Sequence, residues 1–441
     1  MGQDPSGGAR ALRLAPLEGP NRFVGSDRAT VALALVPLVV QKFGGTSVAD
    51  PERIREVADH VARTRRRGDD VVVVVSAMGK ETDELLRLAA EVSKVRPGRE
   101  MDMLITAGER KATALLCMAL ADLGVPADSF TGSQAGFITD GTHTNAKILE
   151  LRPDRLRAAL SEGRTPVVGG AQGVSADDHD VTFLGRGGSD TTAVALAHAL
   201  DAHSCELYTD VPGVFTADPR VVDDAHRIGS ISFEEMLEMT ACGCPKPAMR
   251  SVEFARTWGV RLHVRSAFTW EPGTWVQEED PSMEQAIVSA VVHDTSEAKI
   301  TVTGVPDQPG IAARLFRLLA DRDVNVDMIV QNVSDKGVTD ISFTLPHDDL
   351  ATGQEITNGL AAEIGATSVT SDADIARVSL VGAGMKSNPG VAARTFEVLA
   401  EHDINIDMIS TSAIRISCIV RQTQVEEAVQ ALHAAFGLGA T

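Results

Sequence analysis

The chain has few cysteines, and the ones it has are scattered. They are odd in number, which together with their spacing excludes a disulfide framework and a paired CxxC zinc site. The five are Cys117, Cys205, Cys242, Cys244 and Cys418. Cys242 and Cys244 have no second ligand pair at a suitable spacing, so we interpret them as structural residues of a tight turn, with no protein-bound metal. This usage fits a reducing compartment and predicts a cytoplasmic location.

Positive charge is also scarce. The 441 residues carry 41 Lys and Arg against 61 Asp and Glu, a formal net charge of -20 at pH 7. Nucleic acids and anionic membranes repel such a surface, so we expect neither as a partner. An anionic ligand must instead be met by a local feature of the chain.

Long hydrophobic runs are missing as well. The run at residues 31–40 holds about ten residues where a membrane span needs about twenty, and its valines favour a buried strand. Residues 1–36 are rich in Gly, Pro, Arg and Ala, and they lack the charged region followed by an apolar region that begins a secretory signal. We expect them to form a disordered leader.

The length and the pattern of the remaining chain predict two or three domains, the first of them α/β. From about residue 37 to 275, short apolar runs alternate with amphipathic stretches. Strands are predicted at residues 71–75, 166–168, 181–184 and 205–208, and helices at 85–92 and 193–200. Such alternation is typical of βαβ units and a mostly parallel sheet.

After about residue 297 the chain repeats itself. Residues 305–329 and 385–409 align without gaps at an offset of 80 residues, which indicates two copies of one small module. Each copy is predicted to contain a strand (299–304 or 377–382), a Pro-Gly turn, an amphipathic helix and a strand ending in Asp-Met-Ile. Gly310 and Gly390 follow the prolines where helices begin, and free backbone N–H groups there can hold a carboxylate. The alternative is a tight strand-to-helix turn and nothing more.

Two glycine-rich segments carry the first candidate chemistry. Lys42 precedes Gly44 and Gly45, which let backbone approach a phosphate while the lysine adds a charge; an exposed lysine before an ordinary turn is the alternative. In residues 185–191, Arg186 can grip a carboxylate, but Asp190 would repel an anion unless a cation accompanies it. We therefore expect Asp190 to pair with Lys42.

A third segment, residues 208–220, follows a predicted strand with a turn-rich loop. In an open α/β sheet, ligands sit at the carboxyl ends of strands, so we expect nucleotide contacts there. With residues 42–50, 76–79, 106–110, 130–136 and 185–193, this segment closely resembles the aspartate kinase family, a branch of the amino acid kinases. The small modules resemble ACT domains, ferredoxin-like units that bind amino acids.

The resemblance implies a three-layer αβα amino acid kinase domain at residues 37–280, with a mostly parallel open sheet. It also implies ACT domains at residues 297–370 and 375–441. The implied reaction is phosphorylation of the L-aspartate side-chain carboxylate by ATP with Mg²⁺, under regulation by lysine, threonine or both. A homo-oligomer joined through the ACT domains is expected.

The family's residue roles transfer by position. Lys42 would stabilise charge on the transferred phosphoryl group, with Asp190 orienting it; Glu109 would accept the aspartate ammonium and Arg186 its carboxylate. The implied substrate residues are Ser76, Thr82, Glu109, Arg186 and Ser189. The implied nucleotide residues are Gly44, Gly45, Thr209, Asp210, Phe215, Arg220 and Lys246. The implied effector residues are Asp307, Gly310, Asn325, Asp327, Gln331, Gly390, Asn405 and Asp407.

The chain departs from the family pattern at several positions. Pro245 stands where the family usually has a lysine near the phosphates, and Lys246 comes one residue late. Ala171 replaces a common Phe, while Ala413 and Ile311 replace frequent glutamates of the two modules. Two alternatives therefore stay open: a kinase for an aspartate analogue in a specialised pathway, and a catalytically impaired regulatory homologue.

Overall fold

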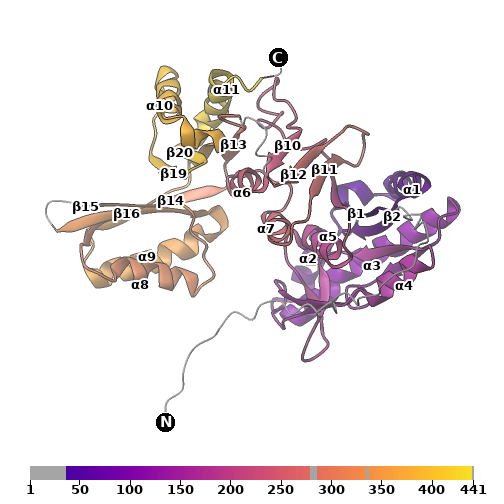
Figure 1. The fold of residues 1–441 in the computed structure, drawn as a ribbon. Coiled ribbons are helices and arrows are strands. Elements are labelled where there is room, and N and C mark those ends of the chain that lie inside the picture. The colour runs from indigo at the N-terminus through magenta and orange to yellow at the C-terminus, as the bar shows by residue number, and fades with distance from the viewer. Residues whose placement is uncertain (1–35, 279–285, 334–336, 440–441) are drawn as a thin grey trace, which may run out of the picture. The chain divides into compact units, whose positions relative to one another are not determined.

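The structure is a computed structural model that describes residues 36–278, 286–333 and 337–439 (Figure 1). Most of the expected leader lies outside the described residues. The chain divides into two compact units, which we call the first and the second unit. The first comprises the described residues up to Val214, Gly229–Phe233, and the residues from Lys246 to 278; the second comprises Phe215–Ile228, Glu234–Pro245, and the described residues from 286 onward. In the described part of the chain, no helix combines the length and apolarity that crossing a membrane would require.

The first unit is built on an eight-stranded sheet with the order β10-β12-β11-β9-β1-β2-β6-β3. Neighbouring strands run parallel except β11 and β12, which confirms the predicted mostly parallel sheet. The strands are β1 (Leu38–Phe43), β2 (Asp70–Val75), β3 (Ala127–Phe130), β6 (Thr165–Gly169), β9 (Ser204–Thr209), β10 (Ser230–Ser232), β11 (Leu262–Ser266) and β12 (Thr274–Gln277).

Helices cover both faces of this sheet. Valines 71–75 are all fully buried because α1 and α3 pack on one face and α5, with α7 against it, on the other. The helices are α1 (Pro51–Arg66), α2 (Glu81–Val92), α3 (Gly98–Asp122), α4 (Asp154–Ser161), α5 (Gly188–Ala199) and α7 (Met249–Trp258). The helices expected at residues 85–92 and 193–200 are confirmed as parts of α2 and α5.

The strand expected at residues 31–40 was placed too early. β1 begins at Leu38, after Val36, which is 53% exposed, and Pro37, which has no N–H to donate; residues 31–35 are not described. A second, small sheet of the first unit has the order β5-β4-β7-β8. Its strands are β4 (Phe137–Thr139), β5 (Ile148–Leu151), β7 (Gln172–Ser175) and β8 (Val181–Phe183).

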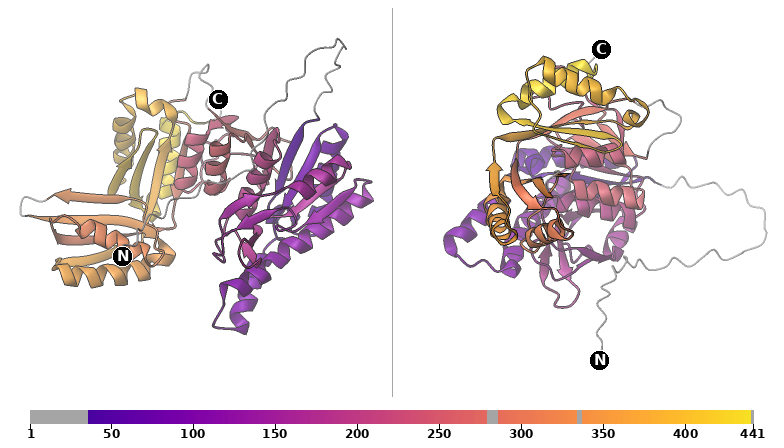
Figure 2. Two further views of the ribbon diagram at one scale, coloured as in Figure 1. Left: turned by 60° about the horizontal axis from the view of Figure 1, so that its bottom comes forward. Right: turned by 90° about the vertical axis from the view of Figure 1, so that its left-hand side faces the viewer.

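The second unit contains two modules, each a four-stranded antiparallel sheet with two helices (Figure 2). The first module, residues 297–372, consists of β14 (Glu297–Pro306), α8 (Ile311–Ala320), β15 (Ile329–Val333), β16 (Val338–Pro346), α9 (Leu350–Ile364) and β17 (Ser368–Asp372). The second consists of β13 (Ala290–Asp294), β18 (Ile375–Val381), α10 (Val391–Glu401), β19 (Met408–Thr411), β20 (Arg415–Arg421) and α11 (Val425–Ala435).

The first module is an insertion in the second. β13 precedes the first module in sequence, yet it pairs with β18 of the second, with Asp294 opposite Arg377. Further pieces from earlier in the chain pack on the second module: Ala217 and Val222 join its apolar core, and α6 (Phe233–Ala241) is held through Glu235, which accepts bonds from Ser289 Oγ (2.6 Å) and the Ala383 N–H (3.1 Å).

Candidate active site and effector modules

A buried ion pair joins the first strand to α5. Lys42 lies on the face of β1 that α5 covers, since its neighbours Gln41 and Phe43 point toward α1. Its Nζ lies 2.5 Å from Asp190 Oδ1, and the two side chains are only 8% and 3% exposed. The structure thus brings together the two residues that the sequence paired.

Asp190 remains a carboxylate despite its burial. Burial opposes ionisation, but the charge of Lys42 and its contact with the carboxylate outweigh this, with smaller help from Lys246 and from the Ala248 N–H, so the pKa of Asp190 lies below its usual value. The Ala248 N–H donates to Asp190 Oδ2 at 3.2 Å. Lys246, although exposed, is therefore close enough for its charge to act at the ion pair.

Glycine backbone closes in on Lys42. A Cβ on Gly44 would lie 3.6 Å from Lys42 Nζ, and one on Gly45 would lie 2.9 Å from the carbonyl oxygen of Ala77. Gly45 is therefore required by the close approach of the loop at residues 76–79, which follows β2. The two glycines leave the space beside the lysine unfilled by side chains of their own.

Glu109 is a buried carboxylate in α3, with 3% of its surface exposed. Burial, reinforced by the negative charge of Glu81, raises its pKa to about 7, although N–H groups including that of Ala77 oppose the shift. Among the described residues its Oε2 has no hydrogen-bond partner. A carboxylate in this state is suited to receive a cationic group from a ligand.

The other expected substrate residues lie at element ends of the same unit. Ser76 follows β2 and Thr82 lies in the first turn of α2, both half-buried, while Ser189 is buried in the first turn of α5 and Arg186 is exposed. Ser47 was not among the expected residues, but its hydroxyl is buried and has no partner within the described part of the chain, which makes it a further candidate. Its place two residues after Gly45 was the signal that could have found it.

The expected nucleotide residues are divided between the units. Thr209 ends β9 and donates to Asp210 Oδ1 at 3.0 Å, with Asp210 exposed beyond the strand. Phe215 and Arg220 belong to the second unit, where Arg220 is 85% exposed and pairs with Asp218 at 2.6 Å. The role of both residues as nucleotide contacts stays a prediction.

Comparison with known proteins identifies the family. The amino acid kinase family model matches residues 37–266, and ACT domain models match 299–362 and 378–436. An aspartokinase of Mycolicibacterium smegmatis is 58% identical over 91% of this chain and 96% of its own. The chain belongs to the aspartokinase family.

Two solved structures of one aspartokinase agree in fold. Escherichia coli aspartokinase III in complex with aspartate and ADP is 26% identical, with a TM-score of 0.75 over 90% of this chain and 99% of that one. The same enzyme in complex with lysine and aspartate gives a TM-score of 0.71 at the same identity and coverage. This aspartokinase-family chain is therefore a kinase enzyme with an αβα catalytic domain and two ACT domains.

The two Asp-Met-Ile segments of the ACT modules are tied to the opposite module. Asp327 of the first module pairs with Arg377 on β18 of the second, and Asp407 of the second pairs with Lys299 on β14 of the first, 2.9 Å from it. Arg421 also contacts Asp407. Two of the three expected effector aspartates, Asp327 and Asp407, thus hold the modules together.

The two methionines of these segments complete the contact between the modules. Met328 and Met408 share a small buried cluster with Ile375 and Ile419. The remaining effector candidates are exposed, and the structure does not assign them a ligand: Asp307, Gly310, Asn325, Gln331, Gly390 and Asn405.

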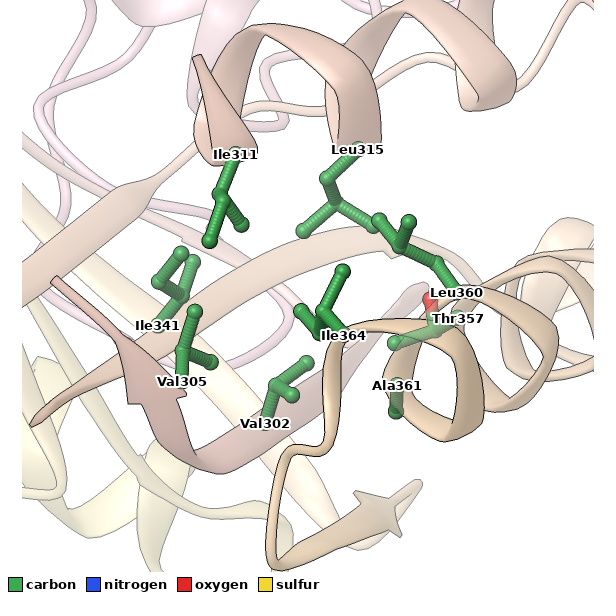
Figure 3. Close-up of a pocket in the computed structure, with 9 residues that line it drawn as sticks. All are labelled: Val302, Val305, Ile311, Leu315, Ile341, Thr357, Leu360, Ala361 and Ile364. Carbon is green, nitrogen blue, oxygen red and sulfur yellow. The ribbon is translucent and has the colours of Figure 1, made fainter. Parts of the chain in front are cut away.

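A pocket in the first ACT module is lined by Ile311, one of the residues that depart from the family pattern. Ile311, at the start of α8, points between the helices and the sheet toward Val305 and Ile341 (Figure 3). The space has an empty volume of about 210 Å³, including its opening to solvent, and its lining is aliphatic apart from Thr357. At this position, where the resemblance implies a glutamate in many relatives, the chain has an apolar side chain turned into the module.

Proposed function

We propose that the chain transfers the γ-phosphoryl group of ATP to the side-chain carboxylate of L-aspartate, giving 4-phospho-L-aspartate and ADP. The observation that carries this proposal is the buried Lys42–Asp190 ion pair beside a glycine backbone at the carboxyl end of β1. The aspartate and ADP bound to the E. coli relative support the same pair of substrates for this chain.

In this reaction a carboxylate oxygen of aspartate attacks the γ-phosphorus, the bond to the β,γ-bridging oxygen breaks, and its electron pair leaves with ADP. The nucleophile is ionised near neutral pH, so no general base is required, and catalysis consists of positioning and charge stabilisation. Lys42 faces the charge on the transferred group, held by Asp190. Glu109 receives the substrate ammonium and Arg186 a substrate carboxylate.

The proposed nucleotide contacts are Gly44, Gly45, Thr209, Asp210, Phe215, Arg220 and Lys246. Mg²⁺, when bound, neutralises the nucleotide phosphates. Within the described residues, no group of three or more His, Cys, Asp or Glu side chains is arranged to hold a metal ion. Lys246, one residue late, reaches the phosphates in place of the usual lysine.

The test is ADP release with L-aspartate, with the acyl phosphate trapped by hydroxylamine. Formation of the hydroxamate at the rate of ADP release supports the proposal. A preference for an aspartate analogue would favour the specialised-pathway alternative, and no turnover with any acidic substrate would favour the regulatory homologue.

We further propose that the ACT modules bind lysine, threonine or both, in a cytoplasmic homo-oligomer joined through these modules. The lysine complex of the E. coli relative supports the first of these effectors. Exposed backbone edges of small sheets favour pairing with a second copy. Light scattering at micromolar concentration tests the assembly, and a monomeric mass would contradict it.

A further inference from the structure

Asp102 is a fully buried carboxylate near the start of α3, outside every site residue named so far. Its Oδ2 lies 2.8 Å from His143 Nδ1 and accepts the Phe183 N–H at 3.0 Å, while its Oδ1 accepts the Thr144 N–H at 2.9 Å. It therefore joins two segments distant in sequence, the loop at residues 143–146 and the end of β8.

Arg250, on α7, grips the same two segments from the other side. It donates to the carbonyl oxygens of Leu184 at 2.8 Å and Ala146 at 3.2 Å. The two segments also bond directly, from the Ala146 N–H to the Phe183 carbonyl at 2.8 Å. Asp102 accepts from N–H groups of the two segments, and Arg250 donates to their carbonyl groups. We call the paired residues 143–146 and 183–184 the ribbon, and Asp102 with Arg250 the clamp that holds it.

The ribbon leads directly into the glycine-rich loop that carries Arg186. Gly185 and Gly187 both have positive φ, at 81° and 70°, so the loop conformation depends on glycine and Arg186 is exposed between them. A Cβ on Gly185 would come within 2.9 Å of Asn145 Oδ1, which shows how tightly the loop rests on the clamped ribbon.

Helix α3, which carries Asp102, also carries Glu109, the residue proposed to receive the substrate ammonium group. Glu109 comes seven residues after Asp102, which is about two helical turns, so the two side chains lie on similar sides of α3. The ammonium and carboxylate groups of an amino acid are a fixed distance apart. A site that receives both must hold its carboxylate and its guanidinium at a matching distance.

We propose that Asp102 and Arg250 are positioning residues that fix Arg186 relative to Glu109 and thereby set the affinity for the amino acid substrate. This inference rests on the proposed function, because it takes Glu109 and Arg186 as the two substrate-binding ends. The alternative is that the clamp only stabilises the fold. In that case its loss would change KM for aspartate and KM for ATP to the same extent.

The decisive variants are Asp102→Leu, which keeps bulk and removes the acceptors, and Asp102→Asn, which keeps one acceptor oxygen. Unpaired buried N–H groups in Asp102→Leu should raise KM for aspartate about tenfold or more while KM for ATP stays within about twofold. Asp102→Asn should restore most of the affinity. Arg250→Met should show the same split, and its effect combined with that of Asp102→Leu should be less than additive, because both hold one ribbon.

The matched controls are Asp128→Leu and Arg164→Met, which break a partly exposed carboxylate–guanidinium pair in the same unit. They should leave both KM values unchanged. Hydrogen exchange on the ligand-free protein gives a second readout: amides of residues 143–146 and 183–187 should exchange faster in Asp102→Leu and not in Asp128→Leu.

Equal rises in both KM values, or an unchanged KM for aspartate in folded Asp102→Leu, would overturn the proposal. If Asp102→Leu does not fold, Arg250→Met decides by the same criterion. Absence of turnover in the parent enzyme would count against the proposed function instead, and the exchange of residues 183–187 would still decide whether the clamp orders the loop.

Discussion

The two units each bury a cation against carboxylates, but they use it differently. In the first unit, Asp190 is the side chain that pairs with Lys42 among the described residues, and glycine lies beside the ammonium group. In the second unit, Arg377 is 1% exposed and contacts Asp327, Glu297 at 3.0 Å and Asp294 at 3.6 Å. It also donates to the Ala241 carbonyl at the end of α6, at 2.7 Å.

If the proposed function holds, the contrast separates a cation that meets a ligand from one used as a structural crosslink. A lysine has three donors, and one carboxylate does not exhaust them. The guanidinium of Arg377 contacts three carboxylates and a carbonyl from both modules and α6, so it crosslinks these elements. Removing each cation should therefore damage a different property.

The largest effect is expected from Arg377→Met, which leaves three carboxylates without their shared partner. The free energy of unfolding of the second unit should fall by about 3–5 kcal/mol. All three tryptophans, Trp258, Trp270 and Trp275, lie in the first unit, so urea unfolding by circular dichroism should shift while the tryptophan fluorescence transition does not. The control is Arg394→Met, which breaks an exposed ion pair with Glu401. Equal shifts of the unfolding transition in both variants would show that Arg377 is not a structural crosslink.

Lys42→Ala should show the opposite behaviour. Loss of a charge positioned for the transferred phosphoryl group should lower kcat by about a hundredfold or more. The unfolding transition of the second unit should not shift, because that unit is untouched. Steady-state kinetics against the exposed Lys94→Ala control measures this, and near-normal turnover would refute the role of Lys42.

The modules themselves should respond weakly to effectors. Ala413 is exposed where the family commonly has a glutamate, and a lost charged partner for an ammonium group weakens binding about ten- to hundredfold. Ala413→Glu should therefore lower the lysine or threonine concentration that halves the initial velocity by a factor in this range. Titrations with each effector, alone and together, test it; an unchanged midpoint would contradict the explanation, and a parent that binds neither by calorimetry would contradict the sensing role.

Lys246 tests whether a displaced charge still serves the nucleotide. Lys246→Ala should raise KM for ATP about tenfold and leave KM for aspartate unchanged, since one charged contact to phosphate is lost. Parallel assays with Lys94→Ala give the control. Equal KM values for ATP in variant and parent would make Lys246 a surface charge only.

The smallest effect concerns the pH dependence set by Glu109. Its pKa of about 7 means that the carboxylate ionises as the pH rises through neutrality, so KM for aspartate should fall over that range. Glu81→Gln removes a neighbouring negative charge and should move the fall to lower pH without changing the high-pH plateau. A KM that does not vary with pH would argue against Glu109 as the ammonium acceptor.

The sequence predicted patterned features and one charge pairing well, and hydrogen bonds to distant backbone groups poorly. The parallel sheet and the duplicated modules follow from periodicity and repetition, and the Lys42–Asp190 pairing follows from the need of a buried carboxylate for a cation. The clamp by Asp102 and Arg250 could not be predicted, because its bonds go to backbone groups far away in sequence. The packing of residues 215–228 on an ACT module could not be predicted either, because the sequence of a turn-rich loop does not indicate which distant residues it contacts.

The insertion of one ACT module into the other favours an order of events during synthesis. β13 emerges before any strand of its own sheet, and its partner β18 follows only after the whole first module. Closing so long a loop costs entropy, but a folded insert brings its two ends together, as the Asp294–Arg377 pairing requires. A folded first module therefore lowers the entropic cost of closing the second module's sheet, and we expect a slow step in the insert to delay whatever packs on the second module, α6 included.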